Sequence, residues 1–214
     1  MGAEMKALQS ALVGLGYAPG PLDGIWGART RSATEALLAA NGRRGGVPAD
    51  PPVTDLPWMV EGKRLLGRHE VRDNGWLSKW LKSDGKTLGD PAKLPWCGDF
   101  METCIRIALP AETFPGALSE NPYWARNWAL FGRKTEPTYG AVLVFVRDGG
   151  GHVGFAVGQE GAYYQVLGGN QSNAVTVARI AKSRCIAARW PATWPVSPIY
   201  LPTLTGGSIT TNEV

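Results

Sequence analysis

The sequence predicts an α+β fold in which helices come first and an antiparallel sheet follows, with a small helical module in front. Before about residue 110 the apolar residues recur at helical spacing, every three or four positions. After residue 140 short apolar segments are separated by loops of Gly, Asn and Ser. Such short loops join antiparallel neighbours, because a parallel pair needs a crossover of about a dozen residues.

The first 41 residues are expected to form a helical hairpin. Its apolar residues recur at helical spacing, namely Met5, Leu8, Leu12 and Leu15, then Ala33, Ala36, Leu37 and Ala40. The turn-rich stretch YAPGPLDGIWG separates the two groups. Residues 42–57 are rich in Pro and Gly and have no apolar period, which is typical of a linker.

Residues 58–195 are expected to form the larger domain, and residues 196–214 a polar tail. One helix begins near Pro57, and a second is expected from about Trp96 to Leu109, preceded by Pro95 and ended by Pro110. The expected strands cover residues 141–147, 152–158, 162–168, 174–180 and 186–191.

Composition excludes several classes of protein. The longest apolar run covers only residues 140–146, whereas a membrane-spanning helix needs about 18 or more apolar residues. The first residues carry Glu4 and helical periodicity in place of a compact apolar region, so we expect no signal peptide. The net charge of +4 suits an anionic surface such as a bacterial wall, but is weak for a nucleic-acid-binding protein, so we expect no nucleic-acid partner.

Cys97 is the candidate nucleophile because of its position at the expected start of a helix. The N-terminal N–H groups and the helix dipole stabilise a thiolate there, so we expect the pKa of its thiol to be lowered. The same N–H groups could bind a developing oxyanion. Cys104 lies two turns further on and is interpreted as a packing residue.

Other uses of the three cysteines remain open but fit the sequence less well. Three cysteines are few for a chain of this length, and an odd number cannot all pair with one another. We therefore expect reduced thiols and no disulfide framework. Cys97 and Cys104 cannot pair within one helix, since a seven-residue rise of about 10 Å exceeds the roughly 7 Å that a disulfide allows; Cys185 could pair with either. Zinc would require these cysteines and His152, yet no C-x-x-C pair is present, so we expect no metal.

His152 and Asn170 could complete a catalytic arrangement with Cys97. His152 follows three glycines and opens a strand, whereas His69 lies in a charged stretch and is interpreted as a solvated helix-end residue. If residues 152–158 and 162–168 form a hairpin, His152 lies beside the turn at residues 168–170. Asn170 could then orient the imidazole, its alternative being a turn residue with a left-handed backbone.

The N-terminal stretch resembles the peptidoglycan-binding module that carries L-Q-x-x-L, L-G-Y, D-G-x-x-G and T-x-x-A. The matching residues are Leu8, Gln9, Leu12, Leu15, Gly16, Tyr17, Asp23, Gly24, Gly27, Thr30 and Ala33. The family continues with Phe-Gln and a second Asp-Gly turn, whereas this chain has Leu37, Leu38 and then the linker, so the module is abbreviated. The resemblance implies wall binding, to which we assign Tyr17, Asp23, Gly24 and Trp26.

The larger domain is similar to phage and bacterial wall hydrolases related to the CHAP and NlpC-type cysteine amidases, which share a papain-like α+β core. The pattern is PWM…G…HEV…WC…F…YGAVLVF…GHVGFAVG…VLGGNQ…RWP. The resemblance implies a catalytic Cys97, His152 and Asn170 in that chain order, with no cofactor. It also implies a groove or supporting role for Glu70, whose alternative is a surface charge, and we assign Gln171 to substrate binding as well. Trp76 and Trp80, and Trp124 and Trp128, are spaced one helical turn apart, which favours core packing over a substrate groove. Trp96, beside Cys97, is the best groove candidate among the tryptophans.

These resemblances imply a phage-type endolysin that cleaves an amide bond in the stem peptide or between muramic acid and L-alanine. We expect a monomer that acts on the peptidoglycan of a Gram-negative wall and does not insert into the membrane. Without a signal peptide it would stay in the host cytoplasm until a holin-type helper released it to the periplasm. The alternatives are an interbacterial amidase toxin, a wall-remodelling enzyme, or a wall-binding phage component without activity.

Overall fold

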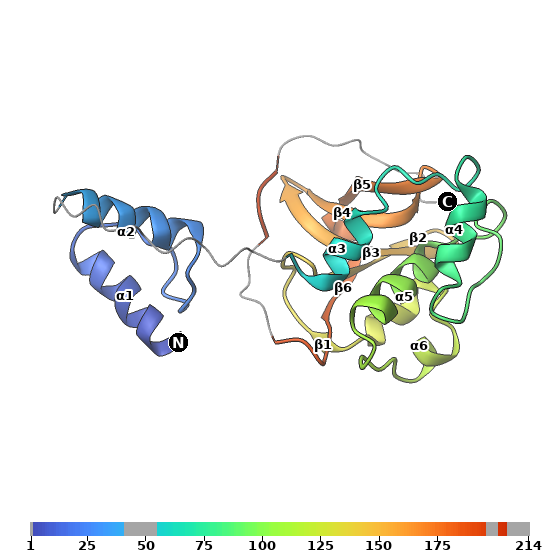
Figure 1. Ribbon diagram of the computed structural model, residues 1–214, viewed down its shortest axis with the longest axis horizontal. Helices are drawn as coiled ribbons and strands as arrows, with labels where there is room; N and C mark the ends of the chain where they lie inside the picture. Colours follow the sequence, from blue (N-terminus) through green and yellow to red (C-terminus); the bar gives the residue numbers. More distant parts are fainter. Residues whose placement is uncertain (1, 41–54, 196–200, 205–214) are drawn as a thin grey trace. The chain divides into compact units, whose positions relative to one another are not determined.

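The computed structural model describes residues 2–40, 55–195 and 201–204. The chain divides into two compact units, Met1–Thr54 and Asp55–Val214. Figure 1 shows both units. Most of the expected linker, residues 42–57, and most of the expected tail, residues 196–214, lie outside the described residues.

The described part of the first unit, residues 2–40, holds two helices, α1 (Gly2–Gly14) and α2 (Ala28–Ala40), as the apolar periodicity predicts. The buried amide of Gln9 organises the turn between them. Its Nε2 donates to Asp23 Oδ1 and to the carbonyl of Ile25, both at 2.9 Å, and its Oε1 accepts the Gly24 N–H at 2.8 Å. Thr30 on α2 completes the network, with its hydroxyl 3.1 Å from Gln9 Nε2. Several polar positions of the sequence motif therefore hold the hairpin together.

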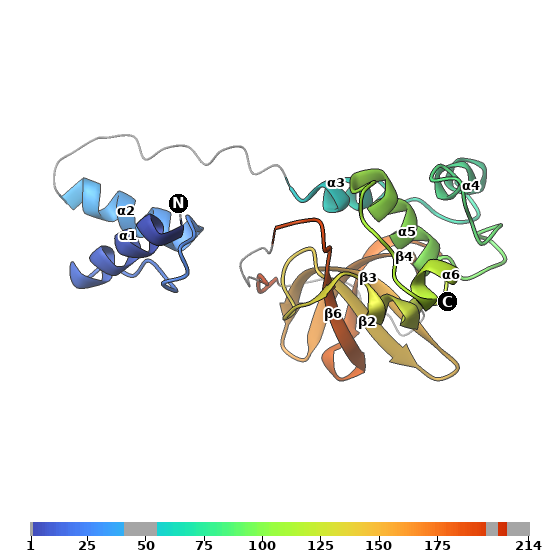
Figure 2. The ribbon, with the colours of Figure 1, turned by 90° about the horizontal axis from the view of Figure 1, so that it is seen from below.

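The helices of the second unit cover one face of a sheet, as Figure 2 shows. They are α3 (Pro57–Lys63), α4 (Asn74–Leu81), α5 (Cys97–Ala108), the single turn α6 (Ala117–Glu120) and the 3-10 helix η1 (Ala125–Leu130). Helix α5 lies at the centre, in contact with α3, α4 and the strands β3 and β4. It begins at Cys97, one residue after the expected start at Trp96, and ends at Ala108, one residue before the expected end at Leu109. Pro110 follows Leu109, as expected for a residue that cannot continue a helix.

Within residues 55–195 the sheet has six strands in the order β1-β6-β2-β3-β4-β5, and all neighbouring pairs are antiparallel. The strands are β1 (Arg133–Lys134), β2 (Val142–Arg147), β3 (Gly150–Glu160), β4 (Tyr163–Gln171), β5 (Ala174–Ala181) and β6 (Cys185–Trp190). The α+β class and the five longer strands are thus as predicted. Strands β2 to β5 form successive hairpins, as their short connections require.

One expected neighbour pair is wrong. Strands β5 and β6 are joined only by the three-residue 3-10 helix η2 (Lys182–Arg184), yet β6 pairs with β2 and β1 at the other side of the sheet. In a flat sheet β6 and β5 would lie about 19 Å apart, but the chain from Ala181 to Cys185 spans at most about 14 Å. The sheet therefore curls, and the curl is visible in Figure 2.

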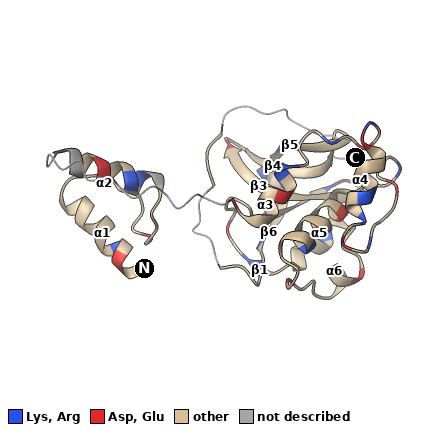
Figure 3. Ribbon diagram, viewed as in Figure 1, with Lys and Arg blue, Asp and Glu red and all other residues tan. Residues whose placement is uncertain are grey.

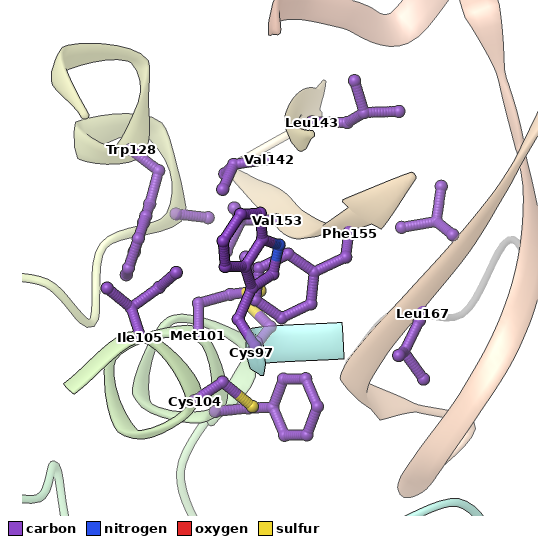
Figure 4. Close-up of a cluster of buried hydrophobic side chains, with 14 of the residues drawn as sticks. Cys97, Met101, Cys104, Ile105, Trp128, Val142, Leu143, Val153, Phe155 and Leu167 are labelled. Atoms are coloured by element: carbon purple, nitrogen blue, oxygen red, sulfur yellow. The ribbon is translucent and has the colours of Figure 1, made fainter. Parts of the chain in front are cut away.

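The core lies between α5 and the curled sheet. Phe100 of α5 contacts Phe155 of β3 with ring centroids 6.5 Å apart, and Cys104 and Leu167 are fully buried nearby. Figure 4 shows this cluster, in which Cys97 and Val153 lie between Trp128 on one side and Leu167 on the other. Of the tryptophans expected in the core, Trp80 and Trp128 are buried, whereas Trp76 and Trp124 are exposed.

Candidate active site

Cys97 is the first residue of α5, and the packing around this helix start is tight. Trp96 is the N-cap residue. A Cβ atom on Gly98 would clash with the carbonyl oxygens of Pro122 and Tyr123, so only glycine fits there. Cys97 itself is only 4% exposed. The candidate nucleophile is therefore covered in this structure.

The surroundings of the Cys97 thiol differ from the sequence expectation. Burial is the largest effect and raises the pKa of the thiol, whereas the backbone N–H groups of Val153 and Gly98 and the charge of Arg147 oppose it. The expected lowering of the thiol pKa at the helix start is therefore wrong, because desolvation of the thiolate outweighs those groups. The contact with Val153 brings the sulfur to the residue that follows His152 in the chain.

His152 lies on β3 and is fully buried. Its ring nitrogen Nε2 lies 3.0 Å from Oε1 of Gln171, at the end of β4. Gly168 makes room for this contact, because a Cβ atom there would lie 3.1 Å from Gln171 Oε1 and 3.2 Å from His152 Nε2. The predicted hairpin of β3 and β4 therefore brings His152 beside residues 168–171, as the topology requires.

The amide of Gln171 determines which ring nitrogen of His152 carries the proton. Nε2 of Gln171 donates to the carbonyl oxygens of Val166 at 3.2 Å and Thr176 at 2.7 Å, so this end of the amide must be the NH₂ group. The opposite end, Oε1, can only accept a hydrogen bond. His152 must then donate from Nε2, and in the neutral ring the basic lone pair is on Nδ1.

His152 contacts Gln171, one residue beyond Asn170, to which the sequence assigned the orienting role. The reason is a bulge in β4. The pairing of β4 with β5 shifts between Gly168 and Gln171, and Asn170 has a φ of 57°. In a regular strand residues 168 and 170 share a face, but the extra residue of a bulge moves the alternation by one. The alternative interpretation of Asn170, a left-handed backbone position, matches its conformation.

The expected substrate-binding residues are buried. Gln171 is 0% and Trp96 1% exposed, so neither side chain is available to a substrate in this structure. Glu70 is 9% exposed, and its Oε2 accepts the indole N–H of Trp96 at 2.8 Å. Glu70 also donates its backbone N–H to the carbonyl of Asn173, beside the β4–β5 turn. Glu70 and Trp96 therefore tie the start of α5 to the sheet, which is a supporting role.

The other cysteines and His69 lie outside this arrangement. All three cysteines are free; Cys104 is buried in the core, and Cys185 begins β6 with its thiol 3.5 Å from the carbonyl of Ala187. His69 pairs with Ala174 in an isolated β-bridge, so it is not the solvated helix-end residue expected. Among the residues that the structure describes, no group of His, Cys, Asp and Glu side chains could hold a metal ion.

A cluster of buried carboxyl groups beside α5 was missed by the sequence interpretation. Burial, together with charge repulsion from Asp84, raises the pKa of Asp99 to about 6 and that of Glu102 to about 7. Within the described part of the chain, Asp99 Oδ1 and Glu102 Oε2 are buried and have no hydrogen-bond partner. The amphipathic pattern of α5 could have shown these positions to be buried, because they lie one turn apart next to Phe100 and Met101.

The residues assigned to wall binding have two kinds of environment. Asp23 and Gly24 bond to Gln9 inside the hairpin, and Gly24 has a φ of 83°. Their roles in this structure are therefore structural. Tyr17 and Trp26 are partly exposed, which leaves their rings accessible at the surface of the first unit.

Comparison with known proteins finds no matching family model, no matching curated protein and no matching solved structure. Within the described ranges, none of the helices has both the length and the apolar character needed to cross a membrane. Figure 3 shows Lys and Arg interspersed with Asp and Glu along the second unit. The site must therefore be interpreted from its own geometry.

Proposed function

We propose that residues 55–195 form a papain-like cysteine hydrolase in which Cys97 is the nucleophile, His152 the base and Gln171 the residue that orients the imidazole. The observation that carries the proposal is the contact of His152 Nε2 with Gln171 Oε1 at 3.0 Å. A base held in one tautomer by a third group is what a thiol nucleophile requires. A further support is that the backbone N–H of Val153, the residue after His152 on β3, bonds to the Cys97 sulfur.

The raised pKa of Cys97 determines how the thiol is activated. A neutral thiol transfers its proton to Nδ1 of His152 as the sulfur attacks the carbonyl carbon of an amide. The tetrahedral intermediate then expels the amine, which takes that proton from His152, and an acyl-enzyme remains. Water attacks the acyl-enzyme with His152 as base, releasing the carboxylic acid and the free thiol. In this proposal the N–H groups at the start of α5 stabilise the oxyanion.

The substrate class that we propose is the peptidoglycan of a Gram-negative wall, cleaved in the stem peptide or between muramic acid and L-alanine as in an endolysin. The support is the combination of this site with a hairpin whose motif residues Gln9, Asp23, Gly24 and Thr30 form one hydrogen-bonded network. Partly exposed Tyr17 and Trp26 are available for wall contacts. Cys97 is 4% exposed, so substrate entry in this proposal requires the residues that cover the thiol to move.

The test is the digestion of purified Gram-negative peptidoglycan, followed by mass spectrometry of the soluble muropeptides. Wild type should release muropeptides with a new amine and a new carboxylic acid, and Cys97→Ala and His152→Ala should release none above background. Cys185→Ala is the matched control, because that thiol lies outside the site, and it should behave as wild type. Wall that is bound by wild-type protein but not cleaved would favour a wall-binding component without activity.

A further inference from the structure

An open cleft of about 580 Å³ lies at the end of the β2–β3 hairpin. Its lining consists of Arg126 from η1, Val146, Arg147 and Asp148 from the end of β2 and the following turn, and Arg184 from η2. Three of these five side chains are guanidinium groups and one is a carboxylate. The cleft is therefore suited to an anion.

The arginines are held in place by the main chain of the hairpin. Nε of Arg126 donates to the carbonyl oxygen of Gly150 at 2.9 Å, and Nε of Arg184 donates to that of Val146 at 3.0 Å. These bonds orient the two guanidinium groups at the edge of the cleft. Nε of Arg147 is buried and has no hydrogen-bond partner among the described residues. A buried donor without an acceptor is costly, so an acceptor from a ligand would stabilise it.

The cleft adjoins the candidate active site. Phe145 of β2 pairs with His152 of β3, and Arg147 lies two residues further along β2, about 7 Å from that pair. The charge of Arg147 also acts on the Cys97 thiol, favouring the thiolate. A ligand group bound by Arg147 would therefore lie close to the bond that is cleaved.

We propose that Arg126, Arg147 and Arg184 bind a carboxylate of the peptide substrate and so select carboxylate-bearing stem peptides. Guanidinium groups match carboxylates in a bidentate geometry. Peptides built from D-glutamate, a diamino acid and D-alanine carry such carboxylates beside and beyond their amide bonds. This inference rests on the proposed function for its substrate, while the anion site itself depends only on the cleft.

The kinetic test compares two synthetic stem peptides, one with free carboxylates and one in which they are carboxamides. Wild type should cleave the free acid with a kcat/KM at least about tenfold higher, as expected for one charge-assisted contact. Arg184→Gln and Arg147→Gln should remove this preference mainly through KM. Arg179→Gln loses the same charge outside the cleft, where its guanidinium lies over Tyr163, and should keep the preference. Equal cleavage of both peptides by wild type would overturn the inference and leave the proposed function standing.

A binding test separates the inference from catalysis. The full-length Cys97→Ala protein is titrated with each of the two peptides, and the arginine Nε–H signals are followed by NMR. The free acid should shift the Arg147 signal and the carboxamide should not, and Arg184→Gln should weaken the binding about tenfold. Such shifts would support the anion site even if wild type cleaved neither peptide, whereas identical responses to both peptides would refute it.

Discussion

His152 depends on Gln171 for the position and tautomer of its ring. The Gln171 amide is itself fixed by two carbonyl oxygens, so its Oε1 faces the imidazole. The sequence places His152 correctly beside the end of β4 because strand alternation and a short turn are enough to pair two neighbouring strands. It could not identify Gln171 as the contact, because the left-handed conformation of Asn170 that shifts the alternation is not apparent from periodicity.

We predict that Gln171→Ala lowers kcat for peptidoglycan cleavage by about 10²-fold or more, since the imidazole loses the acceptor that selects its tautomer. The measurement is the initial rate of muropeptide release over a range of pH, in which the pH dependence should change along with the rate.

Asn170→Gly is the matched control for this prediction. Glycine tolerates the φ of 57° at position 170, so the bulge and the Gln171 contact should remain. This variant should keep activity within about threefold of wild type. If Asn170→Gly were inactive while Gln171→Ala cleaved normally, Asn170 would be the orienting residue after all.

The position of Cys97 depends on contacts that hold the start of helix α5 against the sheet. The indole N–H of Trp96 bonds to Glu70, and the ring packs on Gly169 of β4. The sequence predicts the start of this helix to within a residue, because Pro95 and Pro110 bracket its apolar period. The packing of Trp96 and Glu70 at this start was not predictable, since Glu70 lies 26 positions away in the chain.

We predict that Gly169→Ala destabilises the second unit by about 1–3 kcal/mol, because its Cβ atom would lie 2.5 Å from the Trp96 ring and 2.7 Å from Cβ of Phe100. It should also lower activity, since Trp96 precedes Cys97. The measurement is denaturant unfolding, together with the rate of muropeptide release.

Gly75→Ala on α4 is the control for this substitution. An added Cβ at Gly75 meets nothing within 4 Å, so this variant should gain up to about 1 kcal/mol from helix propensity. Equal stability of Gly169→Ala and wild type would show that the start of α5 is not packed as described.

The curl of the sheet is a property of the whole second unit. The curl brings the end of β5 close to the start of β6, although β2, β3 and β4 lie between these two strands in the sheet. The sequence predicts the strands one by one, because each has an apolar run bounded by turn residues. The position of β6 beside β2 was not predictable, since it depends on the closure of the sheet and not on any local pattern.

The buried carboxyl groups should make stability pH-dependent. In the folded protein the pKa of Glu102 is raised from 4.5 to about 7 and that of Asp99 from 3.8 to about 6. Between the ordinary pKa values and the raised ones, the folded state therefore binds more protons than the unfolded state. The free energy of unfolding then falls as the pH rises from about 4 to 7. We predict that Glu102→Gln flattens this fall and stabilises the protein by about 1–3 kcal/mol at pH 8.

Denaturant unfolding at several pH values measures this effect. Glu120→Gln, at an exposed carboxylate, should follow the wild-type pH profile. An unchanged pH profile in Glu102→Gln would mean that Glu102 titrates normally in the folded protein.

The most direct measurement of the central claim is to trap the acyl-enzyme. Wild-type protein is mixed with peptidoglycan fragments, quenched in acid within the first turnovers, digested and mapped by mass spectrometry. The account predicts an acyl adduct on the peptide that contains Cys97, no adduct on the Cys104 or Cys185 peptides, and none in His152→Ala. Cleavage of the same fragments by Cys97→Ala at the wild-type rate would contradict it.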